Sequence, residues 1–121
     1  MKAICFIFAM GCLWPLGSSA QNPLRIPDTL AGPVLDLDLQ AGTHVFYPGH
    51  TTSTLGANGA FLAPTLLLRR NNPVQINVRN NLSDTTTIHW HGLHVPAEDD
   101  GGPHSYIPAG AQWSPSFTVL D

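Results

Sequence analysis

The chain has 121 residues, a formal net charge of −3 at pH 7 and only 11% charged residues. Its five Lys and Arg residues are too few for a basic surface that would hold nucleic acid, so we expect no nucleic-acid partner. Eleven Gly and eleven Pro residues indicate many turns, which is typical of all-β domains.

Residues 1–20 have the pattern of a secretory signal peptide. Lys2 supplies a positive charge, and residues 3–14 are apolar but too short to span a bilayer comfortably. Ser18-Ser19-Ala20 provides the small residues that signal peptidase requires. We therefore predict cleavage after Ala20, a periplasmic or secreted protein, and no membrane partner after the signal is removed.

Both cysteines, Cys5 and Cys12, lie within this predicted signal. Residues 21–121 can therefore form no disulfide and offer no thiolate ligand, although export leads to an oxidising compartment. A metal bound by this part of the chain must be held by histidine, carboxylate, backbone or water. About a hundred residues are enough for one domain at most.

The first predicted strand, residues 34–39, alternates strictly between apolar and acidic side chains, which indicates a half-exposed strand with Leu35, Leu37 and Leu39 on one face. Residues 43–47 predict its hairpin partner, with Val45 and Tyr47 facing inward. The Thr-, Gly- and Ala-rich residues 50–63 predict a loop with short extended pieces.

Three more strands are predicted downstream, at residues 65–68, 74–78 and 112–120. Pro115 marks an edge or a bulge in the last of them. The side chains expected to face the core in the last two strands are Val74, Ile76, Val78, Trp113, Phe117 and Val119. Many short strands at this spacing, without a helical period, predict an all-β sandwich or barrel.

The segment that suggests chemistry is Thr85-Thr86-Thr87-Ile88-His89-Trp90-His91-Gly92. Its β-branched residues favour an extended strand, in which His89 and His91 share one face and Trp90 points to the other. Two residues of strand span roughly 6.5–7 Å, so the imidazoles can reach one metal ion or two neighbouring ions. Imidazole binds copper, zinc, iron and nickel, and the spacing does not choose among them. The competing interpretation is a pair of partly buried, hydrogen-bonding histidines.

A polar, glycine-rich loop follows between Pro96 and Pro108, and contains Glu98-Asp99-Asp100-Gly101-Gly102. A carboxylate near the histidines could relay protons, but composition alone does not choose between Asp99 and Asp100. The other four histidines have no paired partner in the sequence. We expect His44, His50 and His104 on the surface, and His94 on the surface or behind the metal ligands.

These motifs together carry a family resemblance. Residues 87–93 (TIHWHGL), followed by the sequence DGGP at residues 100–103 and IPAG at residues 107–110, resemble the first cupredoxin domain of a multicopper oxidase. The bacterial copper-tolerance and laccase-like branch is the most similar. The resemblance implies an all-β, cupredoxin-like Greek-key sandwich or barrel. We expect residues 21–121 to be a partial N-terminal domain of this kind, incomplete at its C-terminal end.

The resemblance also implies a function. Multicopper oxidases couple one-electron oxidation of a substrate, such as cuprous ion or a phenol, to the reduction of dioxygen to water. Their cofactor is copper, and eight histidines in four His-x-His motifs hold a trinuclear cluster. The motif here matches the first of the four. His89 would bind the type 2 copper, His91 would bind a type 3 copper, and Asp100 would be the catalytic acid that delivers protons.

Only two of those eight histidines can be matched in this chain, and no type 1 copper ligands can be matched. We therefore expect a fragment or a truncated product that is inactive by itself. One alternative is a periplasmic copper-binding module without catalysis. Another is a cupin-type mononuclear metal enzyme, which is disfavoured because Glu98 lies too far beyond His91 and Ser83 stands where that family has Gly.

Overall fold

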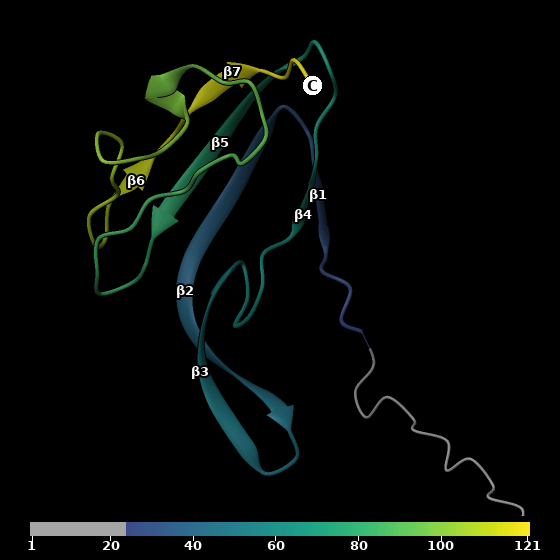
Figure 1. Cartoon of the computed structure of the whole chain (residues 1–121), viewed down its shortest axis with the longest axis vertical. Coiled ribbons are helices and arrows are strands. Elements are labelled where there is room, and N and C mark those ends of the chain that lie inside the picture. Colours follow the sequence, from purple (N-terminus) through teal and green to yellow (C-terminus); the bar gives the residue numbers. More distant parts are fainter. Residues whose placement is uncertain (1–23) are drawn as a thin grey trace, which may run out of the picture.

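The structure is a computed structural model that describes residues 24–121 (Figure 1). The predicted signal peptide and its cleavage site lie outside the described residues. Within residues 24–121 there are seven strands, one turn of 3-10 helix and no α-helix: β1 (Thr29–Ala31), β2 (Val34–Tyr47), β3 (His50–Ala57), β4 (Thr65–Leu67), β5 (Pro73–Asn80), the 3-10 turn (Ala97–Asp99), β6 (Gln112–Trp113) and β7 (Ser116–Thr118). The same residues include no helix long and apolar enough to cross a lipid bilayer.

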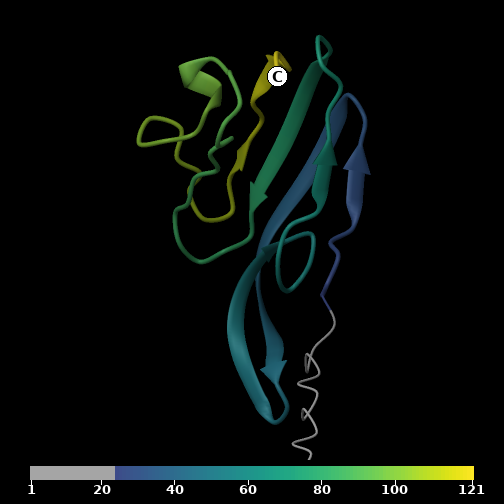
Figure 2. The ribbon, with the colours of Figure 1, turned by 45° about the vertical axis from the view of Figure 1, so that its right-hand side comes forward.

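Five of the strands form one mixed sheet in the order β3-β2-β5-β6, and β7 also pairs with β5. β2 and β5 run parallel, with Leu35 opposite Ile76 and Leu37 opposite Val78. The pairs β2–β3, β5–β6 and β5–β7 are antiparallel. β1 and β4 form a separate two-stranded parallel sheet, and Figure 2 shows these two strands side by side next to the main sheet.

The core lies on one face of the main sheet, because β2 and β5 alternate in phase. Their inward side chains are all buried, as predicted: Leu35, Leu37, Leu39, Val74, Ile76 and Val78. The same cluster also contains Ala57, Trp90, Ile107, Phe117 and Val119, and Leu30 and Leu66 of the small sheet pack against it. The opposite face is polar: Asn77 donates a hydrogen bond to Asp36 (2.9 Å), and Arg79 pairs with Asp38 (3.4 Å).

The predicted hairpin at residues 43–47 is wrong in its strand boundaries. β2 continues without a break through Ala41-Gly42 to Tyr47, and its partner is β3, which occupies the first eight residues of the predicted loop. The threonines of β3 favour extended backbone, and two neighbouring strands satisfy each other's backbone groups. Residues 50–63 are therefore a loop only in their second half.

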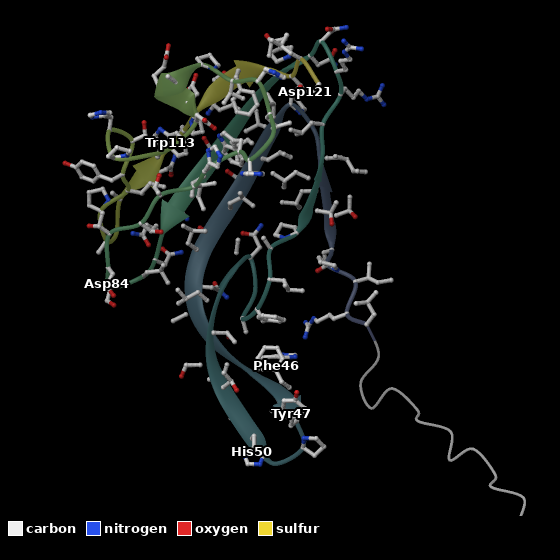
Figure 3. All side chains as sticks on the ribbon, viewed as in Figure 1. Phe46, Tyr47, His50, Asp84, Trp113 and Asp121 are labelled. Carbon is white, nitrogen blue, oxygen red and sulfur yellow. The ribbon has the colours of Figure 1, made fainter. Side chains whose placement is uncertain are left out.

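The inward placement of Val45 and Tyr47 is also wrong. Their exposed fractions are 52% and 66%. Val45 keeps the alternation of β2, but the β2–β3 hairpin extends beyond the body of the domain, so this end of the strand has no core to face (Figures 1 and 3). Alternation predicts which face a residue occupies, and tertiary structure decides whether anything covers that face.

The predicted last strand is divided in two. β6 and β7 are separated by Ser114 and Pro115, in agreement with the predicted irregularity at Pro115. Pro115 has no N–H to offer the sheet, but its carbonyl accepts a hydrogen bond from the Ile76 N–H (3.0 Å), so the segment stays attached to β5. Phe117 and Val119 are buried as predicted, whereas Trp113 is only half-buried.

Candidate copper site

The His-Trp-His segment is extended but is not a strand of the sheet. Only Thr86 forms a β-bridge, with Ile107, through backbone hydrogen bonds of 3.0 and 2.7 Å. The predicted strand over residues 85–92 is therefore wrong in its hydrogen bonding. Its neighbour is the loop of residues 99–107, whose glycines and proline cannot supply a regular ladder of partners. The alternation of side chains persists without the ladder.

Trp90 anchors the segment to the core, from the face opposite the two histidines, as the alternation predicts. It is 9% exposed, and its ring stacks on that of Trp113 at a centroid distance of 6.3 Å. The centroid of the Phe117 ring lies 6.0 Å from that of Trp90. The indole Nε1–H donates a hydrogen bond to the Asp99 carbonyl (2.8 Å). Trp90 therefore attaches the histidine segment (residues 85–92) both to the hydrophobic cluster and to the acidic loop (residues 99–107).

His89 and His91 lie on the exposed side of the segment, opposite Trp90. Their ring centroids are 5.6 Å apart and the ring planes are inclined at 81°. Gly92 follows in a turn, with φ of +89°, closed by a hydrogen bond from Leu93 N–H to the Trp90 carbonyl (3.0 Å). A left-handed backbone of this kind favours glycine, which explains the residue type at this turn.

The loop around Asp100 controls the proton on His89. Nδ1 of His89 lies 3.1 Å from the Asp100 carbonyl oxygen and 3.0 Å from its carboxylate Oδ1. The carbonyl oxygen can only accept, so Nδ1 carries the hydrogen and Nε2 keeps its lone pair. Oδ1 is shielded from solvent and makes no hydrogen bond of adequate geometry despite its closeness to Nδ1, so we assign the bond to the carbonyl. This tautomer leaves the Nε2 lone pair of His89 available as an acceptor, for a hydrogen bond or for a metal ion.

The structure separates the two acidic candidates of the loop. The Asp100 carboxylate faces His89, and its side chain is 32% exposed. The Asp99 carboxylate instead points toward the Ser116 N–H, at 3.4 Å, while its carbonyl receives Trp90. Only Asp100 is brought to the histidines, as the resemblance implies, and its role in proton delivery stays a prediction.

Sequence reasoning missed the contribution of Thr87. Its hydroxyl accepts a hydrogen bond from the Gly102 N–H (3.0 Å) and donates one to the Ser105 carbonyl (3.3 Å). Thr87 thus connects the histidine segment to the loop that carries Asp100. A hydroxyl two residues before a candidate ligand is the only signal for this in the sequence, and a threonine there is equally explained by its preference for extended backbone.

Two of the remaining histidines have specific partners. His94 is an exposed residue whose backbone N–H and Nδ1 lie 2.8 and 2.5 Å from the Asp121 carboxylate. These contacts, the backbone hydrogen bond first, lower the pKa of Asp121 from its usual value of 3.8. His44 is half-buried rather than a simple surface residue, because it stacks on Phe61 (4.9 Å) and meets Phe46 edge-on (4.7 Å).

The two imidazoles fit part of a copper site. Neutral imidazole binds both Cu(II) and Cu(I), and the lone pair on His89 Nε2 is available. No group of three or more His, Cys, Asp or Glu side chains able to share a metal ion occurs within residues 24–121. The two imidazoles are therefore compatible with copper, but within residues 24–121 they are not joined by a third side chain of these types.

Residues 27–121 match the family described as multicopper oxidase. The chain belongs to the multicopper oxidase family. It is 43% identical over 83 residues to the multicopper oxidase mco of Staphylococcus aureus, covering 69% of this chain and 19% of that protein. It is also 33% identical over 111 residues to the cell division protein FtsP of Escherichia coli, covering 87% of this chain and 24% of that protein.

Solved structures agree. The laccase-like multicopper oxidase CueO of an Ochrobactrum species matches with a TM-score of 0.78 and 38% identity, over 82% of this chain and 23% of that one. The family resemblance and the cupredoxin fold are confirmed, and the cupin alternative is excluded. The chain spans about a fifth of the length of the multicopper oxidase mco that it matches (19%).

Proposed function

We propose that this chain contributes the first His-x-His motif of the trinuclear copper cluster of a multicopper oxidase that is exported to the periplasm or secreted. His89 supplies a ligand to the type 2 copper and His91 a ligand to a type 3 copper. When bound, copper supplies one-electron redox chemistry, by which oxidation of cuprous ion or a phenolic substrate is coupled to reduction of dioxygen. Residues beyond this chain complete the cluster.

The observation that carries the proposal is the arrangement of the two imidazoles. They share one side of a segment whose other side is held by Trp90, with ring centroids 5.6 Å apart. Nδ1 of His89 is committed to the Asp100 carbonyl, which leaves Nε2 for a metal. A pair of purely structural histidines has no need to be held next to one another on the exposed side of such an anchored segment.

Asp100 is proposed as the proton-delivering acid. Its carboxylate has one oxygen covered beside His89, while the side chain keeps 32% exposure. A carboxylate in this position can take a proton from water and hold it close to the histidines, where dioxygen reduction consumes protons. The geometry supports Asp100 over Asp99, whose carboxylate faces Ser116.

A second candidate function is copper binding without catalysis. It is favoured by the incomplete donor set, since two imidazoles on one segment can bind a copper ion but cannot assemble a trinuclear cluster. One matched relative is named as a cell division protein rather than as an oxidase. Metal binding without turnover is the behaviour that this alternative predicts.

The test is made in the oxidase that contains these residues. We expect His89→Ala to abolish oxygen uptake with a phenolic substrate and to lower the copper content, while the blue absorption of the type 1 copper persists. Asp100→Asn keeps the shape of the side chain but not its proton transfer, so copper content stays while turnover falls by about 10²–10⁴-fold. Unchanged turnover in His89→Ala refutes the ligand assignment.

His50→Ala is the matched control, because His50 begins β3 at the exposed tip of the hairpin, far from the site (Figure 3). It should leave turnover and copper content unchanged. The 121-residue chain with added copper should show no oxygen uptake above that of free copper. Sustained oxygen reduction by that chain would contradict the proposal that it needs partners for the cluster.

A further inference from the structure

We infer that Thr87 and Gly101 are positioning residues, which hold the Asp100 carbonyl against Nδ1 of His89 and so fix this imidazole as its Nδ1–H tautomer. Neutral imidazole in water favours the opposite tautomer, with hydrogen on Nε2, which would block the nitrogen that faces away from the loop. The inference deepens the proposed function, since it explains how His89 is kept ready as a ligand.

Gly101 permits the close approach of the loop. Its backbone has a φ of +68°, and a Cβ added there would lie 1.7 Å from the Ile88 carbonyl oxygen and 3.0 Å from the Thr87 hydroxyl. No side chain larger than hydrogen fits without moving the loop away from the histidine segment. The absence of a side chain at Gly101 therefore allows the neighbouring Asp100 carbonyl to reach His89.

Thr87 fixes the position of the loop relative to the histidine segment through two hydrogen bonds. Its Oγ1 accepts from the Gly102 N–H at 3.0 Å, and its hydroxyl hydrogen is directed to the Ser105 carbonyl at 3.3 Å. Two residues further along the segment, His89 Nδ1 meets the Asp100 carbonyl at 3.1 Å, and Trp90 Nε1–H meets the Asp99 carbonyl at 2.8 Å. Hydrogen bonds with four residues of the loop, at positions 99, 100, 102 and 105, therefore fix its position along the histidine segment.

These contacts determine the tautomer because a carbonyl oxygen can only accept a hydrogen bond, whereas Nδ1 can either donate or accept one. A backbone carbonyl never donates, so an Nδ1 within hydrogen-bond distance of it is favoured only when it carries the hydrogen. If the loop moves away, Nδ1 loses this acceptor and the preference of free imidazole returns. Neither Thr87 nor Gly101 forms a hydrogen bond with His89, so they act through the carbonyl of Asp100.

The experiment reads the tautomer directly in the metal-free, ¹⁵N-labelled 121-residue chain. Two-bond ¹H–¹⁵N correlation spectra identify which ring nitrogen carries the hydrogen, at about two pH units above the usual imidazole pKa so that the ring is neutral. We expect His89 as the Nδ1–H tautomer in the wild type. Thr87→Val and Gly101→Ala should move the tautomer ratio toward Nε2–H by about fivefold, the effect of losing one hydrogen bond.

Two variants separate positioning from general damage. Thr87→Ser retains the hydroxyl and should restore the wild-type ratio. Gly110→Ala is the matched glycine control, because Gly110 has a φ of +74° but nothing within 4 Å of an added Cβ. It should carry the same backbone strain with no effect on His89. Exposed His50 provides an internal reference for the free-imidazole ratio in every spectrum.

An Nε2–H tautomer of His89 in the wild type overturns the inference outright. An unchanged ratio in folded Thr87→Val refutes the role of Thr87, and an equal shift in Gly110→Ala refutes the specific role of Gly101. If Gly101→Ala fails to fold, comparison of Thr87→Val with Thr87→Ser still tests whether the loop contacts set the tautomer of His89. Turnover of His89→Ala in the oxidase that contains these residues is a separate measurement. An Nδ1–H tautomer in this chain, with unchanged turnover of that variant, would leave this inference standing and refute the proposed function.

Discussion

Trp90→Ala is the substitution that most directly tests how the candidate copper site is attached to the core. The side chain is 9% exposed, packs against Trp113 and Phe117, and donates a hydrogen bond to the Asp99 carbonyl. Truncation therefore removes the most deeply buried contact between the histidine segment and the core, where Ile88 also packs. It also releases the carbonyl that precedes Asp100.

The magnitude follows from burial. A core aromatic side chain removes roughly 150–250 Å² from water, and at about 25 cal/mol per Å² this contributes roughly 4–6 kcal/mol. Alanine retains a small part of that area, and measured truncations of buried aromatic residues cost about 3–5 kcal/mol. We expect the same range for the loss in free energy of unfolding. Trp90→Phe keeps a ring but loses the indole hydrogen bond, so a smaller loss of about 1–2 kcal/mol is expected.

Urea unfolding followed by far-UV circular dichroism measures these losses, because removal of a tryptophan would confuse a fluorescence signal. Tyr106→Ala is the matched aromatic control. Tyr106 lies in the loop that carries Asp100 but is 60% exposed, so its truncation should change the free energy of unfolding by less than about 0.5 kcal/mol. A loss below about 1 kcal/mol for Trp90→Ala would mean that Trp90 faces solvent and that the two histidines face the core.

Asn80→Asp should lower the free energy of unfolding, measured with urea, by about 2–4 kcal/mol. The reason is that the fully buried Asn80 amide donates hydrogen bonds to the carbonyls of Asp84 (2.8 Å) and Ile107 (2.9 Å), which a carboxylate cannot do. An unchanged free energy of unfolding would contradict these contacts. The pKa of the Asp121 carboxyl should lie below 3.8 in a ¹³C NMR titration, because His94 hydrogen bonds favour its ionised form. Because folding lowers this pKa, the contact stabilises the fold above pH 3.8, and that stabilisation is lost as the pH falls through the folded-state pKa. A titration midpoint at or above 3.8 would refute the pairing. N-terminal sequencing of the exported product should begin at Gln21, and a product that starts at Met1 or at Cys12 would overturn the predicted signal peptide.

The sequence by itself determined the features that depend on local chemistry. Alternation in β2 and β5 identified six core residues, because a strand exposes successive side chains to opposite faces whatever its partners are. The same rule placed Trp90 on one face of its segment and both histidines on the other. The motif His-Trp-His-Gly followed by Asp-Gly-Gly-Pro is specific enough to indicate the multicopper oxidase family by itself, and the family match over residues 27–121 confirms it.

Tertiary structure alone decided what each face meets. Val45 and Tyr47 have the pattern of inward residues, but the hairpin that carries them extends past the core. The histidine segment has the composition of a strand, but its neighbour is a glycine-rich loop that supplies few backbone partners. The choice of Asp100 over Asp99 as the acid beside His89 depends on the turn of the loop at Gly101, which lies against the Ile88 carbonyl. Asp99 and Asp100 have identical side chains, so only the direction that the folded backbone gives to each of them distinguishes the two.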